Sequence, residues 1–273
     1  MDRMLYVVMS GAKETLLAQA SNSHNLANAN TPGFLADLQT FRSMPVHGNG
    51  HPTRVYSMSE RPAAELAHGA AVVTGRSLDV AVNGDGWFAV QAHEGNEAYT
   101  RRGDLRVDSN GLLTTGNGLP VMGNNGPIAI PPAEKMEIAA DGTISIRPLG
   151  QSAAELAVID RIKMVNPQLS AMDKGEDGLM RLKDGAEAEA DAEVQLANGV
   201  LESSNVNIVD SMVQMIGLSR RFELQVKMMQ EADEAEKALA NTTWGPANLG
   251  YFRGGGFSST FLTSAEMPVT MYR

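Results

Sequence analysis

The longest regular pattern of apolar positions lies near the end of the chain, between about Asn207 and Ala240. Its seam positions alternate in steps of three and four residues, at Ile208, Met212, Met215, Ser219, Phe222, Val226 and Met229. This spacing predicts an α-helix that presents one face to another helix. Asn207 can cap its start, and the helix would be roughly 50 Å long. Such a strut needs a partner, although periodicity alone fits an ordinary amphipathic helix in one bundle equally well.

A second helix is predicted over residues 2–29, near the start of the chain. Its apolar stripe is narrow and is interrupted by Gln19; it runs through Leu5, Met9, Ala12, Leu16, Ser23 and Leu26. A helix with so thin an apolar face is marginal on its own. If it pairs with the late helix, each fully buried Leu, Met or Phe adds roughly 1.5–3 kcal/mol. We therefore expect the two terminal helices to pack together, with the rest of the chain inserted between them.

The first helix is followed by residues that stop helices and form turns. Asn25 and Asn28 favour hydrogen bonds from side chain to backbone. Pro32 lacks an N–H group, Gly33 permits a sharp turn, and Phe34 can then pack against apolar residues. We interpret these five residues as a helix stop and not as a binding site. Prolines and glycines between residues 35 and 76 exclude long helices and predict an extended connector.

From residue 77 the pattern changes to short apolar runs separated by turns. Eight Asn-Gly or Asp-Gly pairs fall between residues 83 and 185. Such pairs tolerate positive φ angles and favour tight hairpins. The pattern predicts a compact antiparallel β domain, either a barrel or a sandwich. Its expected core residues are Val80, Val82, Trp87, Phe88, Val90, Tyr99, Leu105, Ile144, Ile146, Val158, Ile162 and Leu182.

These patterns predict an α+β chain of five parts: paired N- and C-terminal helices in a coiled-coil-like arrangement, with an inserted, mainly antiparallel β domain. Residues 1–34 form the N-terminal helix, 35–76 the extended connector and 77–200 the β-rich middle domain. Residues 201–244 form the C-terminal helix that pairs with residues 1–34. The last segment, residues 245–273, is rich in glycine and serine and has no period, which predicts a disordered extension or a foreign tail.

The composition of the chain argues against several classes of function and site. The net charge of −10 offers no basic stripe, which argues against nucleic acid as a partner. The chain has no cysteine, which excludes disulfides, thiolate metal sites and cysteine nucleophiles. No apolar run approaches the roughly 20 residues of a membrane span. The first residues lack the apolar core and cleavage site of a conventional signal peptide.

We find no arrangement of residues that predicts catalysis, cofactor binding or metal binding. His47 and His51 are four apart, but nearby glycines and a proline make a helical zinc pair unfavourable. The Asp108-Ser-Asn-Gly segment resembles the start of a calcium loop without the required terminal glutamate. Paired carboxylates are common in so acidic a chain, so a glycosidase pair is left open by inspection. Aromatic residues to line a sugar groove are scarce, with only two tryptophans.

Three stretches together resemble the bacterial flagellar rod and hook axial proteins. The N-terminal signature of that family is similar to residues 21–34, SNSHNLANANTPGF. The motif that opens its middle domain is similar to residues 77–90, SLDVAVNGDGWFAV, and its C-terminal helix to residues 201–234. Their order and spacing also agree, over about residues 1–240. The start MDRMLYVVMSGA and the short connector at 35–76 are most similar to the proximal-rod member of the family, because distal-rod relatives usually carry a longer connector.

The resemblance implies a structural subunit of the flagellar basal-body rod, not an enzyme. Its terminal helices would pair and stack with copies of itself and with other rod proteins to form the axial drive shaft, while the β domain decorates the outside. The resemblance further implies export through the flagellar type III apparatus without a cleaved signal, and a rod that spans the periplasm. No cofactor, nucleic acid or direct membrane span is expected. Two alternatives stay open: a distal-rod or hook subunit, and a secreted β protein that binds or hydrolyses carbohydrate.

The candidate assembly surface follows from the two apolar stripes. For each of its residues, packing within one subunit is as well supported as contact between subunits. The surface comprises Leu5, Met9, Leu16 and Leu26 on the first helix, and Ile208, Met212, Met215, Phe222, Val226 and Met229 on the late helix. The family's signature turn corresponds to Asn25, Asn28, Pro32, Gly33 and Phe34.

Overall fold

A computed structural model describes residues 4–39, 41–45, 55–59, 63–148, 156–175 and 177–243. These residues form two long helices, one near each end of the chain, and twenty short strands between them. The helices are α1 (Met4–Ala27) and α2 (Ile208–Thr243). Every strand pair is antiparallel. The predicted α+β class, with two terminal helices and a mainly antiparallel β region, is confirmed. The expected tail at 245–273 lies outside the described residues.

Helix α2 begins where the sequence predicts it. The side-chain oxygen of Asn207 accepts hydrogen bonds from the backbone N–H groups of Val209 at 3.0 Å and Asp210 at 3.3 Å. This cap satisfies two of the donors that a helix leaves unpaired at its start. Asp210 also places a negative charge in the first turn, where the helix dipole favours it. The predicted cap is therefore confirmed.

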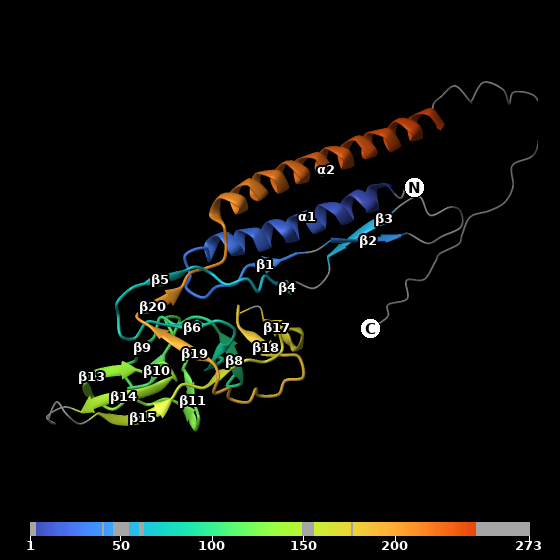
Figure 1. Cartoon of the computed structure of the whole chain (residues 1–273). Helices are drawn as coiled ribbons and strands as arrows, with labels where there is room; N and C mark the ends of the chain where they lie inside the picture. Colours follow the sequence, from blue (N-terminus) through green and yellow to red (C-terminus); the bar gives the residue numbers. More distant parts are fainter. Residues whose placement is uncertain are drawn as a thin grey trace, which may run out of the picture.

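The two helices lie side by side and run in opposite directions (Figure 1). The amide Nδ2 of Asn22, late in α1, donates to the backbone oxygen of Ser211, early in α2, at 2.7 Å. In the first half of α1, a Cβ atom added at Gly11 would lie 3.2 Å from Nε2 of Gln225, near the middle of α2. These two contacts fix the antiparallel register, and they place the N-terminal end of α1 far from the β region.

Short strand pairs connect the helices to the β region. They involve β1 (Asp37–Leu38) with β4 (Ala63–Ala64), β2 (Phe41–Pro45) with β3 (Val55–Ser59), and β5 (Ala71–Val73) with β20 (Val200–Glu202). The β2–β3 hairpin packs along α1 through β3 (Figure 1). The extended connector predicted at residues 35–76 thus contains five short strands among its described residues.

The β body, which we define as strands β6 to β19, forms several small sheets. Its largest sheet has the order β16-β7-β8-β18-β17, and a second has the order β13-β14-β15; β19 pairs with β6, β10 with β9, and β11 with β12. The strands are β6 (Val80–Asn83), β7 (Trp87–Gln91), β8 (Glu97–Thr100), β9 (Arg106–Val107), β10 (Leu113–Thr114), β11 (Met122–Gly123), β12 (Gly126–Pro127), β13 (Ala133–Ile138), β14 (Thr143–Pro148), β15 (Ala157–Arg161), β16 (Met164–Val165), β17 (Met172–Lys174), β18 (Met180–Leu182) and β19 (Gln195–Asn198). A 3-10 turn spans Leu169–Ala171.

The glycines of the eight predicted turn pairs all adopt positive φ angles. In the pair at Asn83 and Gly84, for example, the glycine has φ 84° and joins β6 to β7. A residue with a Cβ atom would be strained there, which explains why glycine recurs between the strands. Four of these pairs lie in hairpins, between β9 and β10, β11 and β12, β13 and β14, and β17 and β18, where the prediction is confirmed. Strands β6 and β7, in contrast, are joined by two such pairs but do not pair with each other.

The core of the β body consists of large apolar side chains that are almost fully buried. Ten of the twelve predicted core residues are buried, among them Phe88, Tyr99 and Ile144. Leu182 is only partly buried against the core. Val158 was wrongly predicted to be a core residue, because its side chain is 67% exposed. It lies on β15, an outer strand of a sheet whose other face contacts the core, so a strand-like apolar residue there points to solvent.

Candidate assembly interface

The face that α1 turns toward α2 and the connector carries small side chains. Its buried positions follow helical spacing at Val8, Ala12, Thr15, Ala18 and Asn22. Small side chains leave room for the partner helix: a Cβ atom added at Gly11 would lie only 3.2 Å from Nε2 of the Gln225 side chain. On α2, Ser211 is buried at the same seam, and Met215, Phe222 and Met229 are half-buried.

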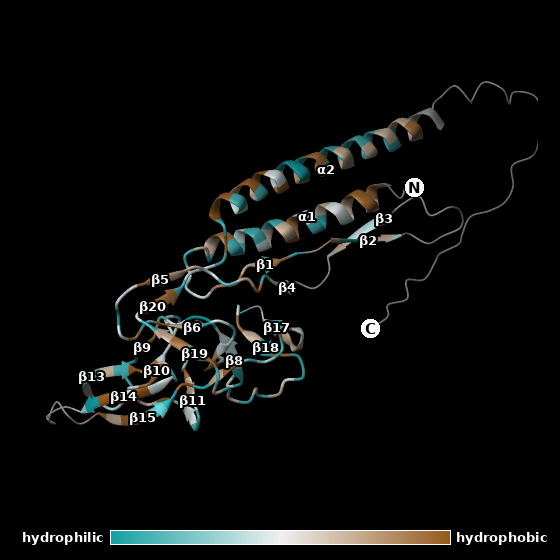
Figure 2. Cartoon of the chain, viewed as in Figure 1, coloured by the Kyte–Doolittle hydropathy of each residue, from teal (hydrophilic) through white to brown (hydrophobic). Residues whose placement is uncertain are grey.

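The large apolar side chains of the helices point mainly outward. On α1 these are Leu5, Tyr6, Met9, Leu16 and Leu17, and on α2 Val209, Met212, Val213, Ile216, Leu224 and Met228. Met9 is 54% exposed and Val213 is 64% exposed. Apolar residues recur along the length of α1 and at the start of α2 (Figure 2). A helix that is apolar on two faces is typical of an element that has neighbours on both sides.

The predicted assembly residues divide into two groups in the structure. The exposed group consists of Leu5, Met9, Leu16, Ile208 and Met212. The half-buried group consists of Leu26, Met215, Phe222, Val226 and Met229. The stripe expected to pair α1 with α2 therefore coincides with the buried face only in part: Ala12 is buried, but the other buried positions of α1 are one to two residues away from the stripe. Contact between subunits stays a prediction for both groups.

The signature turn attaches the end of α1 to the connector. The Asn25 side chain forms two hydrogen bonds with the backbone of Asp37: its Nδ2 donates to the carbonyl at 3.0 Å, and its Oδ1 accepts from the N–H at 2.8 Å. The side chain of Asn28 donates to the carbonyl of His24 at 3.0 Å and accepts from the Thr31 hydroxyl at 3.1 Å. The expected helix stop is thus also a fixed attachment between the helix and strand β1.

Gly33 and Phe34 bring this turn against the β body. Gly33 has φ 65°, its N–H donates to the backbone oxygen of Glu202 at 2.8 Å, and a Cβ atom would overlap the backbone of Arg101. Only glycine fits such an approach. The Phe34 ring is buried, with Nζ of Lys174 placed 4.4 Å from its centroid. The ammonium group above the ring face forms a cation–π contact between the connector and β17.

A buried ion pair lies at the centre of the junction between helices and β body. Nε of Arg101 donates to Oε2 of Glu202 at 2.6 Å, and both side chains are at most 5% exposed. The other guanidinium nitrogens donate to the carbonyls of Gly86 at 2.7 Å and Gly84 at 2.9 Å. Burying two charges is costly unless their hydrogen bonds are satisfied, and here they are.

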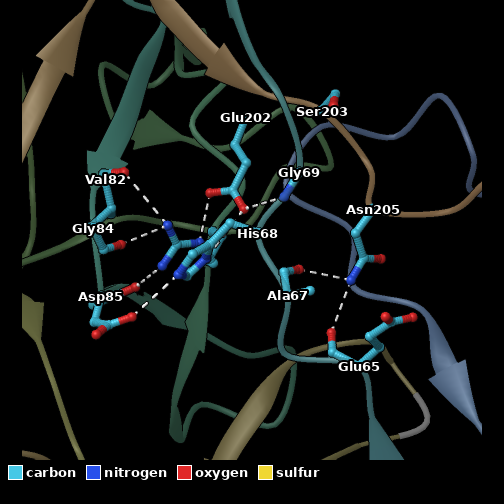
Figure 3. A network of polar contacts seen from close by, with 12 residues as sticks. Glu65, Ala67, His68, Gly69, Val82, Gly84, Asp85, Glu202, Ser203 and Asn205 are labelled. Atoms are coloured by element: carbon cyan, nitrogen blue, oxygen red, sulfur yellow. Dashed lines mark hydrogen bonds and ion pairs between the residues drawn. The ribbon is translucent and has the colours of Figure 1, made fainter.

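Glu202 connects three segments that are far apart in the sequence. Its other carboxylate oxygen accepts a hydrogen bond from the N–H of Gly69 at 3.1 Å, while its backbone belongs to β20 at the base of α2. Figure 3 shows Glu202 between Gly69 on one side and Val82, Gly84 and Asp85, from the end of β6 and the turn after it, on the other. A Cβ atom at Gly69 would overlap the backbone of Ser203, so the two segments are in direct contact.

Asn205 ties the start of α2 to the connector in the same way. Its side-chain oxygen accepts from the N–H of Ala36 at 2.7 Å, and its Nδ2 donates to the carbonyls of Glu65 and Ala67, both at 2.9 Å (Figure 3). His68, beside it, contacts Asp85 at 3.2 Å. The polar side chains at this junction therefore fix where both helices leave the β body.

Sequence reasoning missed Arg101, Glu202 and Asn205. The one signal in the sequence is position: Arg101 directly follows the buried strand β8, and Glu202 ends the apolar run Val200-Leu201. Charged residues next to apolar strands are rarely buried unless they are paired. Which charge pairs with which, across about 100 residues, cannot be read from a single chain.

A groove opens beside the helix pair at the end nearest the β body. Its volume is about 480 Å³, and it is bounded by α1, α2 and the segment around β1. Small side chains, Ala18, Ser21 and Gly217, line it together with the more exposed Leu38, Phe41 and Val213. Among the described residues, no cluster of histidine, aspartate and glutamate could hold a metal ion, and no helix is long and apolar enough to cross a membrane.

Two family models match the chain. The model described as the flagellar hook protein FlgE/F/G D1 domain matches residues 81–146, within the β body. The model described as the flagellar basal body rod FlgEFG protein C-terminal matches residues 197–242, which cover β20 and α2. The matches thus include both the ion-paired junction and the C-terminal helix.

Individual relatives extend the similarity over most of the chain. The flagellar basal-body rod protein FlgF of Escherichia coli K12 is 43% identical over 240 residues, covering 86% of this chain and 95% of the relative. FlgF of Salmonella typhimurium is 42% identical, covering 86% and 96%. FlgG of Bacillus subtilis is 30% identical over 264 residues, covering 88% and 99%.

The chain belongs to the family of flagellar hook and basal-body rod proteins. It is a structural subunit of the flagellar basal-body rod, in a family of structural proteins and not of enzymes. Within the family it is most like FlgF, since its similarity to FlgG is lower. The predicted resemblance and function are confirmed, and the carbohydrate-active alternative is set aside. The family also places the chain in the flagellum, where it assembles with other axial proteins.

Proposed function

We propose that the helix pair formed by α1 and α2 is the element through which this subunit joins copies of itself and other rod proteins. The pair would act as a coiled-coil-like building block of the proximal rod, and the β body would lie on the outside of the shaft. In this proposal the chain divides as the sequence predicts: a terminal helical part, made of the segments 1–34 and 201–244 that contain α1 and α2, a connector at 35–76 and a β domain at 77–200.

One observation carries the proposal: the helix pair keeps its large apolar side chains on its outer surface. Leu5, Met9 and Leu16 are each at least 39% exposed, although an isolated pair would be more stable with these residues at its seam. Exposed apolar patches of this kind mark surfaces that contact other proteins. Met9, Met212 and Met228 add adaptable side chains, which suit a surface that packs against several different neighbours.

The charges on α2 restrict where such contacts can form. Its first three turns expose Val209, Val213 and Ile216, whereas Arg220 and Lys227 are exposed further along the helix. Burying unpaired charges in an interface is unfavourable. The first three turns of α2 are therefore the better candidate for a tightly packed contact, and the rest of the helix for a more hydrated one.

Delivery to the rod is the second part of the proposal. Its resemblance to the rod proteins implies export through the flagellar type III apparatus without a cleaved signal, followed by assembly across the periplasm. A subunit with a weak seam and exposed apolar faces can be unfolded for export at small cost and completed by packing at its destination. The distal rod and hook are the alternative positions, and the lower identity to FlgG favours the proximal rod.

A matched pair of substitutions tests the proposal. Val213→Glu on α2 and Val158→Glu on β15 introduce the same charge at valines that are 64% and 67% exposed. We expect V213E to abolish incorporation into purified basal bodies and swimming, and V158E to leave both near the level of the unchanged protein. Circular dichroism of both purified variants checks that each is folded. If V213E incorporates as well as V158E does, the helix pair is not the assembly element.

A further inference from the structure

Two surface features of the helix pair, an apolar tip and a groove lined by both apolar and polar residues, differ in shape and lie at opposite ends of it. The first, which we call the α1 tip, consists of Leu5, Tyr6 and Met9 near the free end of α1 (Figure 1). It is convex, because it is the outer surface of a single helix. The second, which we call the root groove, is the cavity of about 480 Å³ beside the C-terminal half of α1 and the start of α2.

The α1 tip and the root groove face in opposite directions. Met9 in the tip and Ala18 in the groove are nine positions apart on α1, which corresponds to a rotation of roughly 180° around the helix axis. Because Asn22 lies next to Ser211, the tip and the groove are also separated by roughly 20 Å along the axis. One chain therefore cannot bring its own tip into its own groove.

We propose that the α1 tip of one copy of this chain docks in the root groove of the next copy. This proposal rests on the proposed function and adds the register of the contact. A convex surface fits a groove better than it fits a second convex surface, so neither feature is suited to pair with itself. Since the tip and the groove point away from each other, such a contact does not close on itself and continues from subunit to subunit.

The groove offers the contacts that the tip requires. Its rim carries Leu38, Phe41 and Val213, all more than 40% exposed, so the apolar side chains of Leu5 and Met9 would remove apolar surface on both partners from water. Its volume lies within the range of about 300–1,000 Å³ of typical binding cavities, which leaves room for a few side chains.

The polar wall of the groove supports the same occupant. Among the described residues, the side-chain oxygen Oε1 of Gln39, which lines the groove, is buried and accepts no hydrogen bond. A buried acceptor without a partner costs free energy. Tyr6, the one tip residue with a hydroxyl group, brings a donor with it, and rotation of the Gln39 amide can direct the oxygen toward that donor. A purely apolar occupant would leave this acceptor unpaired.

Cysteine cross-linking can test the contact without native cysteines in this chain, because the chain has none. Cells that produce both Met9→Cys and Val213→Cys variants are used to purify basal bodies, which are oxidised and analysed without reductant. We expect a disulfide-linked dimer that contains one copy of each variant. The double variant M9C/V213C is expected to shift from the monomer to a ladder of dimers, trimers and larger species. Lys227→Cys, on the charged part of α2, replaces Val213→Cys in the control and is expected to stay monomeric.

The outcomes separate this proposal from the proposed function. If both variants enter basal bodies but M9C cross-links to itself, or to K227C as readily as to V213C, the register is wrong and the assembly role stands. A double variant that stops at closed dimers also overturns the register. If neither cysteine variant is found in basal bodies although the unchanged chain is, Tyr6→Phe and Gln39→Ala variants are measured instead. Amounts of both variants in basal bodies equal to that of the unchanged chain would contradict the contact. If the unchanged chain itself is missing from basal bodies, the proposed function fails as well.

Discussion

The β body and the helix pair place their large apolar side chains in opposite ways. In the β body, Phe88, Leu105 and Ile144 are fully buried, and glycines with positive φ angles form the tight turns between its strands. In the helix pair, small residues such as Ala12 and Ala18 occupy the seam, and larger ones remain outside. The β body therefore contains a complete core, whereas in our proposal the helix pair contributes one part of a core that neighbouring subunits complete.

This difference has a physical basis in how each region obtains its stability. Burial of apolar surface contributes roughly 25 cal/mol per Å², so a region that leaves its leucines and methionines exposed has little to offset its loss of conformational entropy. The polar junction around Arg101 and Glu202 lies between the two regions. It fixes the direction in which the helices leave the β body without adding apolar surface to them.

Truncating one large side chain in each region is the most direct test of this difference in packing. Phe88→Ala in the β body is expected to lower the free energy of unfolding by about 3–5 kcal/mol, because it leaves a cavity in a buried core. Leu16→Ala on α1, at an exposed position, is expected to change it by less than about 0.5 kcal/mol. Chemical denaturation of both purified variants measures these changes. Equal losses for the two variants would mean that α1 packs as tightly as the β body.

Removing one partner of the Arg101–Glu202 ion pair tests how strongly the junction between the β body and the helix pair contributes to stability. Glu202→Ala leaves the Arg101 guanidinium buried without its counter-charge, and we expect a loss of about 3–5 kcal/mol in unfolding free energy. Lys237→Ala, which breaks the exposed pair with Asp233 on α2, is the control and is expected to leave the unfolding midpoint unchanged. A comparably small effect of E202A would show that the junction does not hold the helices in place.

The smallest expected effect is a pH dependence of the unfolding free energy, caused by Tyr99 in the β body. Burial raises the pKa of Tyr99 to about 12, and the Glu97 carboxylate adds to this, while the N–H of Ala188 donates to its oxygen at 2.6 Å. The pKa is higher in the folded than in the unfolded chain, so the folded state binds more protons above pH 10. The stability from Tyr99 is thus complete below about pH 10 and is lost as the pH rises through about 12.

Tyr99→Phe tests this assignment, because phenylalanine cannot ionise. We expect the unfolding free energy of the unchanged chain to fall more steeply between about pH 10 and 12 than that of Y99F. Ultraviolet absorbance of tyrosinate in the folded protein gives an independent measure of the titration. Parallel stability curves for the two proteins would contradict a buried, neutral Tyr99.

Much of the β body could be predicted from the sequence, because its signals are local. Gly84 and Gly142 follow Asn or Asp at tight turns, and the strands between such turns alternate or concentrate apolar residues. The α2 start at Asn207 was also predictable, since a capping side chain acts within a few residues of its own position. Val158 shows the limit: an apolar residue in a strand does not reveal which face of the sheet is covered.

The arrangement of the helices and the junction could not be predicted in the same way. Helix α1 is apolar on two faces, so periodicity alone cannot decide whether Leu16 or Thr15 faces α2. The larger side chain suggests that Leu16 faces α2, whereas in the structure Thr15 is buried and Leu16 is exposed. The pairing of Arg101 with Glu202 depends on two segments that meet only after the chain has folded. The signature residue Gly33 was interpreted as part of a helix stop, whereas its close contact with Arg101 became visible only in three dimensions.

Amide hydrogen exchange of the free subunit and of the assembled rod tests the central claim most directly. In the free chain, the amides of α1 and α2 are predicted to exchange much faster than those of β7, because local opening of the helix pair exposes little buried apolar surface. In the rod, the same helical amides are predicted to become as protected as β7. If the helices of the free chain are already as protected as β7, or stay unprotected in the rod, the claim that other subunits complete their core is wrong.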